Sequence, residues 1–414
     1  MRVLLPTLGS VGDIHPFLAI GQAARARGHQ VEVITNPLFG PLVAKAGLDF
    51  HAVGTAAQFE ETYRSPKLWH PVHGFGVFWR RMARFVIEPV YQRISEHRPG
   101  QCVVLATPLM LGARLAQERL GVPLVTAYTA ATMLRSCRHP MTLAQWRLPR
   151  WLPRGARALA WRALDRWKLE PMVAADLPPL RAKLGLRPLQ QSVFGQWVHS
   201  PSAGVTLFPD WFAPRPDDWP PQVREAGFPL FDGDSEVGLD PGLLRFLDDG
   251  APPIVFTTGS AMAHGHAFFD AAVRSCESLG RRGVLLTPES RQIPAQLPES
   301  MLHCAYAPFG LLLLRAAALV HHGGVGNCAQ ALRAGIPQLV MPYGFDQFDN
   351  AMRLEMLGVG AMLEPADRSP EALADALEKL LNSEPVAEAC RRCAGRLVDG
   401  GSANRVCELL ERQV

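Results

Sequence analysis

The sequence predicts an α/β protein made of two doubly wound domains, each with a parallel sheet covered by helices on both faces. Short apolar runs alternate with helical patterns along both halves of the chain, as expected when parallel strands are buried on both sides. The length of 414 residues is too great for one ordinary domain and suits two of about 200. With 48% hydrophobic and 19% charged residues, each half can bury a core.

The strands and helices follow from these patterns in chain order. Strands are expected at Arg2–Thr7, Gln30–Thr35, Cys102–Thr107, Leu124–Tyr128 and Gly204–Phe208, then at Pro253–Thr258, Gly283–Thr287, Ala317–His321, Gln338–Pro342 and Gly360–Leu363. Helices are expected between them, at Ile14–Arg27, Leu109–Leu120, Ala267–Leu279 and Gly326–Ala334. Ligands should bind at the carboxyl ends of the strands, in the cleft between the domains.

A stretch rich in Pro, Asp and Gly, at about 209–240, separates the two series and is typical of a linker. We therefore assign 1–215 to a first domain, 216–240 to the linker and 241–390 to a second domain. The remaining 391–414 form a helical segment that is expected to cross back to the first domain.

Composition excludes several classes of function. The net charge of +4 is small for this length and argues against nucleic acid as a partner. The eight cysteines are scattered, and the start of the chain lacks the apolar region of a signal peptide, which predicts a cytoplasmic protein with free thiols. Cys390 and Cys393 form a C-x-x-C without a second pair, so we assign them no zinc or redox role. No apolar run reaches the ~18 residues of a membrane span.

One segment, Arg135 to Lys168, breaks the α/β pattern. It contains many arginines, four tryptophans (Trp146, Trp151, Trp161 and Trp167) and one acid, Asp165. Basic residues interleaved with Trp at helical spacing indicate a face that contacts an anionic membrane surface, on the inner side of the cytoplasmic membrane. The alternative is a solvated helix whose tryptophans fill the core, and the sequence leaves both interpretations open.

The most specific motif is His321-His322-Gly323-Gly324-Val325-Gly326-Asn327. It follows an apolar strand and opens a helix, so that free backbone N–H groups and the helix dipole face an anion. The glycines let the backbone approach a diphosphate, and His322 and Asn327 add side-chain donors. A structural turn would look similar, but the next strand leads to Asp346 and Gln347, which can bracket adjacent sugar hydroxyls.

A second turn, Leu8 to Phe17, follows the first strand. Its spacing is G-x-x-G rather than G-x-G-x-x-G, which disfavours a nicotinamide cofactor. The carboxylate of Asp13 in this turn can act as a general base, and burial in a cleft would raise its pKa. Asp13 can also cap the helix, and the two roles do not exclude each other. His15 is the reserve candidate for the base.

The order of these motifs, H-x-G-x-x-[NST] followed by P and then D-Q, resembles the donor-binding signature of glycosyltransferase family 1. The resemblance implies the GT-B fold of two Rossmann-like domains, with the acceptor bound by 1–215 and the nucleotide sugar by 241–390. It also implies an inverting hexosyltransferase that uses a nucleotide-sugar donor and no further cofactor. By position it implies Asp13 as the catalytic base. It implies donor contacts from Thr258, Ser260, Tyr306, Ala307, His322, Gly324, Gly326, Asn327, Gln330, Asp346 and Gln347.

Two departures from the family bear on the donor. Members that use a uridine donor often have an acid at the position of Gln330, where it binds both ribose hydroxyls. A neutral amide serves one hydroxyl, which favours a deoxyribose and hence a dTDP-sugar over a UDP-sugar. Phe309, where glutamine is frequent, also weakens a uridine-specific site. We interpret Asp232-Gly233-Asp234 as a linker turn and expect no metal, with the diphosphate charge met by the helix dipole and His322.

Other segments are similar to the rhamnosyltransferases of bacterial rhamnolipid biosynthesis. They are Tyr63–Pro71, Glu88–Tyr91, Gln196–Pro201, Leu207–Pro220, Gly227–Gly233 and Asp346–Asn350. This resemblance implies dTDP-L-rhamnose as donor and a 3-(3-hydroxyalkanoyloxy)alkanoate as acceptor, giving mono-rhamnolipid. We expect the acceptor near Gly12, His15, Phe75, Phe78 and Trp79.

Two alternatives remain at this point. One is a UDP-glucose-dependent transferase acting on sterols, phenols or polyketides. The other, from a different class, is a non-catalytic nucleotide- or lipid-binding protein, which would keep the phosphate turn but would not need Asp13.

Overall fold

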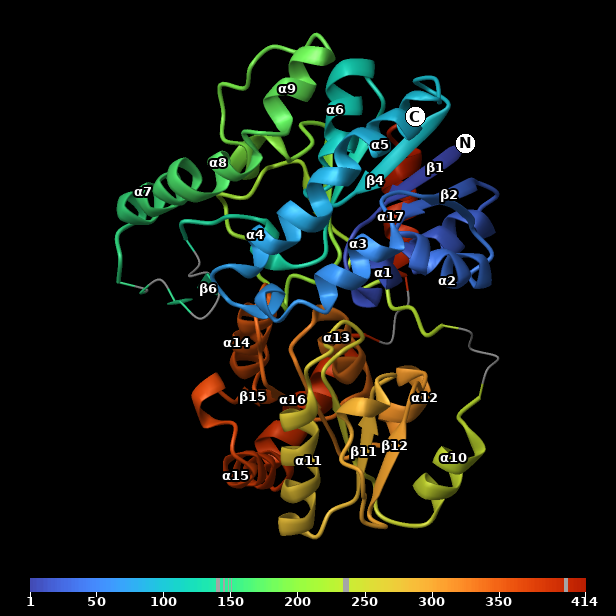
Figure 1. The fold of residues 1–414 in the computed structure, drawn as a ribbon, viewed down its shortest axis with the longest axis vertical. Coiled ribbons are helices and arrows are strands. Elements are labelled where there is room, and N and C mark those ends of the chain that lie inside the picture. The colour runs from blue at the N-terminus through green and yellow to red at the C-terminus, as the bar shows by residue number, and fades with distance from the viewer. Residues whose placement is uncertain (139–141, 144–145, 148, 150, 234–237, 398–400) are drawn as a thin grey trace.

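The computed structural model describes residues 1–414 except 139–141, 144–145, 148, 150, 234–237 and 398–400, and only the backbone of 142–143 and 146–147. Each half of the chain contains one parallel sheet, as the sequence predicted. In Figure 1 the first half of the chain lies above and the second half below.

The first sheet has the order β3-β2-β1-β4-β5-β8-β9. Its strands are β1 (Arg2–Pro6), β2 (Gln30–Thr35), β3 (Asp49–Ala52), β4 (Cys102–Ala106), β5 (Leu124–Tyr128), β8 (Ala203–Thr206) and β9 (Val223–Glu225). Leu4 and Val104 enter one core cluster while Leu5 and Val103 enter another, so helices cover both faces. The strand order reverses between β1 and β4, and a crevice for ligands is expected at their carboxyl ends.

Two edge strands of this sheet were not predicted. β3 is exposed along most of its length, and only the first residue of β9 is buried, so neither forms an apolar run. Since β9 pairs with β8, the first sheet extends into the range assigned to the linker. The helices of this half are α1 (Val11–Ala26), α2 (Gly40–Lys45), α3 (Ala56–Tyr63), α4 (Gly74–Phe78), α5 (Arg84–Ser95), α6 (Leu111–Leu120), α7 (Arg154–Leu164), α8 (Glu170–Val173) and α9 (Leu177–Lys183). A short hairpin, β6 (Thr142–Leu143) and β7 (Trp146–Arg147), precedes α7.

The second sheet has the order β12-β11-β10-β13-β14-β15. Its strands are β10 (Ile254–Thr257), β11 (Gly283–Leu286), β12 (Met301–Cys304), β13 (Ala318–His321), β14 (Gln338–Val340) and β15 (Gly360–Met362). The helices are α10 (Pro241–Asp248), α11 (His266–Leu279), α12 (Phe309–Leu312), α13 (Val325–Ala334), α14 (Gln347–Leu357), α15 (Pro370–Leu381), α16 (Glu384–Gly395) and α17 (Ser402–Glu411). The order reverses between β10 and β13, where the second crevice is expected.

The chain returns to the first half at its C-terminal end, as predicted. In Figure 1, α17 is drawn in red, and it packs against α1 (blue) and contacts β4. Val406, Cys407 and Leu410 of α17 are buried in a core cluster of the first half, and Glu411 pairs with Arg27 at 2.6 Å. In contrast, α16 stays with the second half, where it contacts α13 and α15.

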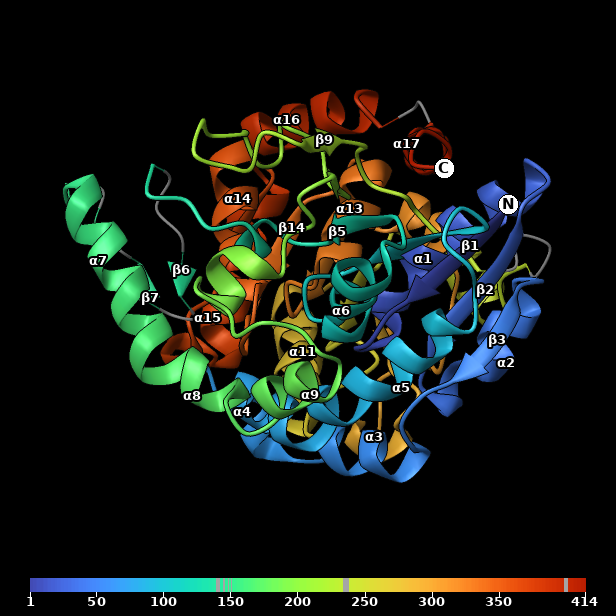
Figure 2. The ribbon, with the colours of Figure 1, turned by 90° about the horizontal axis from the view of Figure 1, so that it is seen from above.

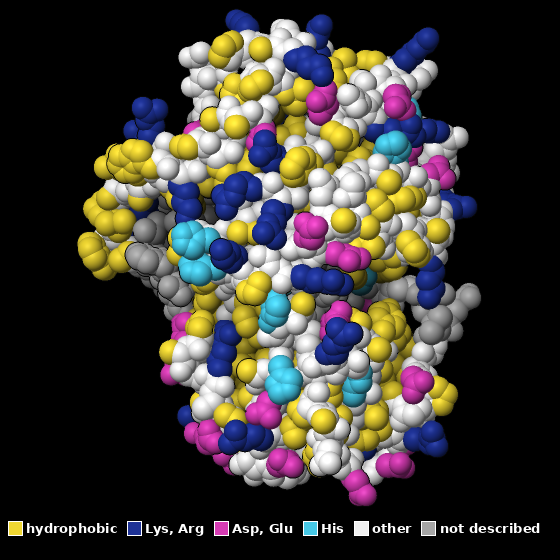
Figure 3. All heavy atoms as spheres, in the orientation of Figure 1, with side chains coloured by type: hydrophobic (Ala, Val, Ile, Leu, Met, Phe, Trp, Pro, Cys, Tyr) yellow, Lys and Arg dark blue, Asp and Glu magenta, His cyan; other side chains and the backbone are white. Residues whose placement is uncertain are grey.

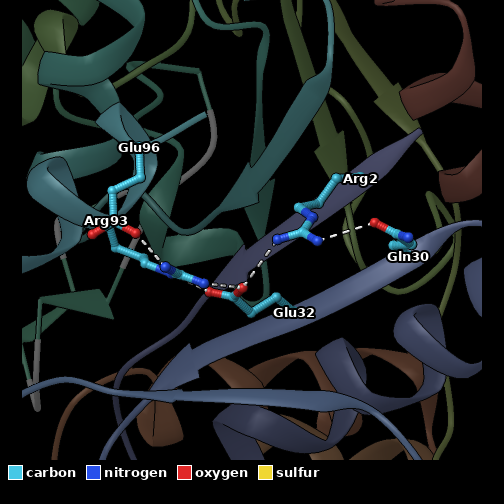
Figure 4. A network of polar contacts seen from close by, with 5 residues as sticks. All are labelled: Arg2, Gln30, Glu32, Arg93 and Glu96. Carbon is cyan, nitrogen blue, oxygen red and sulfur yellow. Dashed lines mark hydrogen bonds and ion pairs between the residues drawn. The ribbon is translucent and has the colours of Figure 1, made fainter. Parts of the chain in front are cut away.

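A buried ion pair fastens α5 to the first sheet (Figure 4). Glu32 on β2 is 4% exposed and accepts two hydrogen bonds from Arg93 of α5, at 2.7 and 2.6 Å. Burial alone would raise the pKa of Glu32, but the hydrogen bonds and charge of Arg93 lower it below its usual value. The pair lies toward the amino ends of the strands, beside Arg2, and therefore serves the scaffold rather than the crevice.

The Trp-rich segment projects from the first half as an arm formed by α7 (Figures 1 and 2). Trp161 is 8% exposed and lies under the guanidinium of Arg135, 4.8 Å from its ring centroid. Trp151 and Trp167 are both 79% exposed, and Figure 3 shows apolar side chains beside Lys and Arg at this edge. The buried Trp161 fits the interpretation as a core residue, and the exposed Trp151 and Trp167 fit the interpretation as a membrane-contacting face. The side chain of Trp146 lies outside the described part. In the part of the chain described here, no helix is both long enough and apolar enough to cross a membrane.

Candidate active site

The second half presents a glycine turn between β13 and α13. Gly323 in this turn has a φ of 93°, a conformation that glycine adopts at little cost. His321 supports the turn from inside the protein: its Nδ1 accepts from the N–H of Gly323 at 3.2 Å, and its Nε2 donates to Oε1 of Gln338 at 3.1 Å. Burial lowers the pKa of His321 to about 3, so it stays neutral. His321 is a structural residue, and the ligand-facing position falls to His322.

Three polar side-chain atoms from the ends of β10 and β13 and the start of α13 are buried without a hydrogen-bond partner. They are Oγ1 of Thr258, Nδ1 of His322 and Nδ2 of Asn327. A buried donor without a partner costs about 1–3 kcal/mol, so such groups are expected where a ligand completes them. The N-cap of α13, Gly324, has no side chain to satisfy the first N–H groups. These groups together make a site for an anion such as a diphosphate.

Thr258 and His322 lie on the same edge of the sheet. A Cβ built on Gly259 would lie 2.5 Å from the ring of His322, so the strand ends that carry Thr258 and His322 are in contact. Burial lowers the pKa of His322 to about 4, and the imidazole therefore meets a ligand as a neutral N–H donor. Ser260, two residues after Thr258, is exposed at the same strand end.

The adjacent residues Asp346 and Gln347 have different roles in the structure. Gln347 is 4% exposed, and its Oε1 accepts from the N–H groups of Tyr343 and Gly344 at 2.7 and 3.0 Å, so it holds the loop before α14. Asp346 occupies the N-cap position of α14 without a side-chain capping hydrogen bond, and its Oδ2 accepts from Nδ2 of Asn350 at 2.8 Å. Burial, and next the charge of Asp13, raises the pKa of Asp346 to about 7.

The first half presents the other turn, between β1 and α1. Oδ2 of Asp13 accepts from the N–H of Ser10 at 2.7 Å and from its hydroxyl at 2.9 Å. Asp13 thus caps α1 with one oxygen, and neither bond uses Oδ1. Burial raises the pKa of Asp13. Gly9 has a φ of 141°, and a Cβ there would lie 2.3 Å from Oδ2 of Asp13, so the turn requires glycine at this position.

The two turns meet across a seam of aromatic residues. The charge of Asp13 raises the pKa of Asp346, which means that the two carboxyl groups lie within electrostatic range. Trp69 lies 6.5 Å from the ring of Tyr63 and 6.1 Å from that of Phe345, and the indole nitrogen of Trp69 is buried without a partner. Phe345, next to Asp346, has a left-handed φ of 56°, which costs a residue other than glycine about 1–2 kcal/mol.

The residues expected near the acceptor lie in different environments. Phe78 and Trp79 are 7% and 1% exposed, and Trp79 donates its indole N–H to Asp176 at 3.2 Å. Both are part of the core, and we leave them out of the acceptor site proposed below. Phe75 is half-buried, with its ring 5.7 Å from that of Phe194.

Gly12 and His15 lie at the start of α1. Gly12 is exposed and His15 is half-buried. The ring of His15 lies 5.1 Å from Phe231 in the linker, and burial lowers its pKa to about 4 against an opposing effect of Asp232. His15 therefore faces the linker as a neutral ring.

Sequence reasoning assigned no role to several residues of this site. Tyr63 and Trp69 stand in a segment noted only for its similarity to a subgroup, and Asn350 ties the loop of Asp346 to the carbonyl of Gly323 at 2.9 Å. Asp232 was interpreted as part of a turn. Since each acts through a contact between segments far apart in the chain, no local pattern could have found it.

Two family models match the chain. Residues 3–137 match the N-terminal domain of glycosyltransferase family 28, and residues 283–411 match the C-terminal domain of erythromycin biosynthesis protein CIII-like proteins. The O-mycaminosyltylonolide 6-deoxyallosyltransferase of Streptomyces fradiae is 29% identical over 432 residues, covering 99% of this chain and 97% of that protein. Glycosyltransferase GtfE of Amycolatopsis orientalis is 28% identical over 414 residues, covering 97% and 96%.

Solved structures share the fold over the whole chain. The glycosyltransferase of kitacinnamycin superposes with a TM-score of 0.76 at 22% identity, covering 100% of this chain and 98% of that one. The spinosyn rhamnosyltransferase SpnG complexed with thymidine diphosphate gives 0.68 at 20% identity, covering 99% and 100%. At such identities the likeness shows the fold alone, which is GT-B.

This chain is a glycosyltransferase. More particularly, it has the GT-B fold, with a first half that matches the family 28 N-terminal domain and a second half that matches the EryCIII-like C-terminal domain. The predicted fold and the predicted enzyme class are confirmed. The motifs suggested family 1, whereas the matching models are described as family 28 and EryCIII-like. The narrower resemblance to rhamnolipid rhamnosyltransferases stays a prediction.

Proposed function

We propose that this enzyme transfers L-rhamnose from dTDP-L-rhamnose to the hydroxyl of a lipophilic acceptor, with inversion at the anomeric carbon and without a metal ion. The observation that carries the proposal is the set of unpartnered buried groups at Thr258, His322 and Asn327. A diphosphate gains negative charge as its bond to the sugar breaks, and preorganised donors stabilise that charge.

The reaction is a displacement with its two ends in the two halves of the protein. Oδ1 of Asp13 takes the proton of the acceptor hydroxyl as its oxygen attacks the anomeric carbon. The bond from that carbon to the diphosphate breaks, and its electron pair leaves with the diphosphate on the turn of His322. Asp346 holds hydroxyls of the sugar between them. The raised pKa of Asp13 brings the base closer to the operating pH, where general-base catalysis is efficient.

A metal ion has no assigned step in this mechanism. Of the two acids in the linker sequence Asp232-Gly233-Asp234, Asp232 is paired with Arg333 and Asp234 lies outside the described residues. Among the described residues, no group of three His, Cys, Asp or Glu side chains could hold a metal. We expect activity to persist in EDTA. Loss of activity that magnesium or manganese restores would contradict the metal-free mechanism.

The donor class rests on the chain and on its relatives. Gln330 stands where uridine-specific enzymes often carry an acid. One relative is named a 6-deoxyallosyltransferase, and a protein of the same fold is a rhamnosyltransferase complexed with thymidine diphosphate. Those names describe those proteins, and they make a thymidine-linked 6-deoxyhexose the first donor to test here.

For the acceptor we favour a 3-(3-hydroxyalkanoyloxy)alkanoate, giving mono-rhamnolipid, with Gly12 and Phe75 near its hydroxyl end. We place the enzyme in the cytoplasm, with the α7 arm on an anionic membrane surface. A second candidate is a UDP-glucose-dependent transferase acting on sterols, phenols or polyketides. The sterol 3-beta-glucosyltransferase of Leptosphaeria maculans is 25% identical over 401 residues, covering 93% of this chain and 27% of that protein.

A competition experiment separates these candidates. The purified enzyme is given dTDP-L-rhamnose and UDP-glucose together, first with a hydroxyalkanoyloxyalkanoate and then with a planar phenol, and the products are measured by mass spectrometry. We expect rhamnosylated lipid to dominate by about tenfold or more, since an unpartnered ribose hydroxyl costs about 1–3 kcal/mol. Faster glucosylation of the phenol would reject the rhamnolipid assignment in favour of the second candidate.

A further inference from the structure

The linker contacts helix α13 of the proposed donor site through the side chain of Asp232. Asp232 of the linker forms a bidentate ion pair with Arg333 of α13, with Nη1–Oδ2 at 2.7 Å and Nη2–Oδ1 at 2.6 Å. Gln330, one turn earlier on α13, donates its amide to Oδ1 of Asp232 at 3.1 Å. Its own Oε1 accepts from Arg333 at 2.7 Å. Two side chains of the helix thus hold the Asp232 carboxylate in place.

The same ion pair touches the loop that carries Tyr306. A Cβ built on Gly310 would lie 2.6 Å from Nη2 of Arg333 and 2.9 Å from the carboxylate of Asp232. A Cβ built on Gly233 would lie 2.8 Å from the hydroxyl of Tyr306. Asp232 therefore lies between the C-terminal half of α13 on one side and the loop after β12 on the other.

This position matches one part of a nucleoside diphosphate. The unpartnered groups of His322 and Asn327 make the phosphate site, one helical turn before Gln330, and Tyr306 supplies an exposed aromatic ring beyond the ion pair. By its covalent structure, the ribose lies between the diphosphate and the base. We infer that Asp232 is a specificity-determining residue of the donor site, whose carboxylate accepts a hydrogen bond from a ribose hydroxyl. This inference rests on the proposed function.

The hydrogen-bonding capacity of Asp232 then limits what the ribose can be. A carboxylate oxygen accepts about two hydrogen bonds. Oδ1 already accepts from Gln330 and from Arg333, whereas in the described part of the chain Oδ2 accepts from Arg333 alone. One acceptor position is left, which suits the 3′-hydroxyl of a deoxyribose, and the second hydroxyl of a uridine donor finds no place on this carboxylate. The linker thus supplies the acid that position 330 lacks, with room for one hydroxyl.

The test is calorimetric titration of the full chain with dTDP, UDP and inorganic pyrophosphate. Asp232→Asn should weaken dTDP binding by about tenfold, as expected when a hydrogen bond to a charged acceptor is lost, and should leave pyrophosphate binding within about twofold of the wild type. The matched control is Asp248→Asn, which removes the acid of an exposed ion pair with Arg315 in the same half and should change neither.

A rescue variant makes the inference sharper. Asp232→Asn combined with Gln330→Glu moves the carboxylate from the linker to α13, still beside Arg333, and should restore dTDP binding. A purely structural role for Asp232 predicts that its loss weakens the binding of dTDP and of pyrophosphate equally. Equal losses for dTDP and pyrophosphate, no loss at all, or failure of the double variant to regain dTDP binding would each overturn the inference. If Asp232→Asn alone does not fold, dTDP binding by the double variant decides the question.

The variant His322→Ala tests the donor site independently of Asp232. If His322→Ala changes the binding of neither dTDP nor pyrophosphate, the phosphate turn is misassigned and the proposed function fails. If His322→Ala weakens both ligands while Asp232→Asn weakens neither, the donor site stands and the role of the linker is wrong.

Discussion

The two turns of this enzyme share a local design and differ in what fills them. Each follows a central strand, is rich in glycine and opens a helix whose N-terminus favours an anion. In the first turn the anion belongs to the protein, since Asp13 accepts two hydrogen bonds from Ser10. In the second, Gly324 offers no cap, and His322 and Asn327 keep buried nitrogens without partners. The first turn holds a charged group in place, and the second is ready to receive one.

The largest test of this difference is Asp13→Asn. The amide oxygen can still accept from Ser10, so α1 keeps its cap, but it cannot take a proton. We expect turnover to fall by about a hundredfold or more, with dTDP affinity unchanged by calorimetry. Ser10→Ala is the matched control, because it removes one bond to Asp13 and leaves the base. Near-normal turnover in Asp13→Asn would reduce Asp13 to a helix cap and make His15 the next residue to test.

The second turn should respond in the opposite way. His322→Ala and Asn327→Ala each remove a donor to the diphosphate, and each should weaken dTDP binding by about 1–3 kcal/mol. His303→Ala, which removes a ring bonded to the carbonyl of Thr287 in the same half, should not. If His322→Ala and Asn327→Ala bind dTDP as tightly as His303→Ala does, the unpartnered groups are not a phosphate site. The contrast between the two turns then fails.

Local patterns carried most of what could be predicted. The strands beside each crevice are fully buried apolar runs, and the residues of the second turn are consecutive in sequence, so both are visible without a structure. The contacts that complete the site are long-range. Asp232 pairs with Arg333 about a hundred positions later, and Trp69 meets Phe345 across the seam. No periodicity records such pairs.

The aromatic run after Phe75 shows the opposite difficulty. An apolar stretch in a lipid-handling enzyme fits a substrate channel and a core equally well, because both bury aromatic rings. Burial of Trp79 is decided by partners such as Asp176 and Phe194, which come about a hundred residues later. Sequence composition therefore gave the chemistry of this region but not its location.

A smaller effect concerns the repulsion between the two halves. Asp346 has a pKa raised from 3.8 to about 7, by burial and then by the charge of Asp13. A carboxyl group with a raised folded-state pKa contributes stability that is fully present below the unfolded value and is lost as the pH rises through the folded value. Between about pH 4 and pH 7, the ligand-free enzyme should therefore lose unfolding free energy that Asp346→Asn does not lose, by up to about 1.4 kcal/mol for each pH unit.

Urea denaturation at about pH 5 and about pH 8 measures this difference. The control is the same comparison in an Asp13→Asn background, where the difference should shrink because the repelling charge is gone. A pH dependence that is equal in the wild type and in Asp346→Asn would mean that Asp346 ionises normally, and that the two turns do not sense each other before the donor binds.

The smallest expected effect is on binding to membrane vesicles, and it concerns the α7 arm of the first half. Arg166 and Trp167 are exposed in the helical turn that follows α7, Asp165–Leu169. Arg166→Gln should lower binding to phosphatidylglycerol vesicles by about fivefold, near 1 kcal/mol for one basic residue at an anionic surface, and the loss should shrink at high salt. Trp167→Ser should also lower binding, but by an amount that salt does not change, since apolar insertion is not screened.

The control is Arg391→Gln on α16, which changes an exposed arginine of the second half. Equal vesicle binding by the Arg166 and Arg391 variants would mean that the arm is an ordinary solvated helix. The enzyme would then take its acceptor, like its donor, from solution.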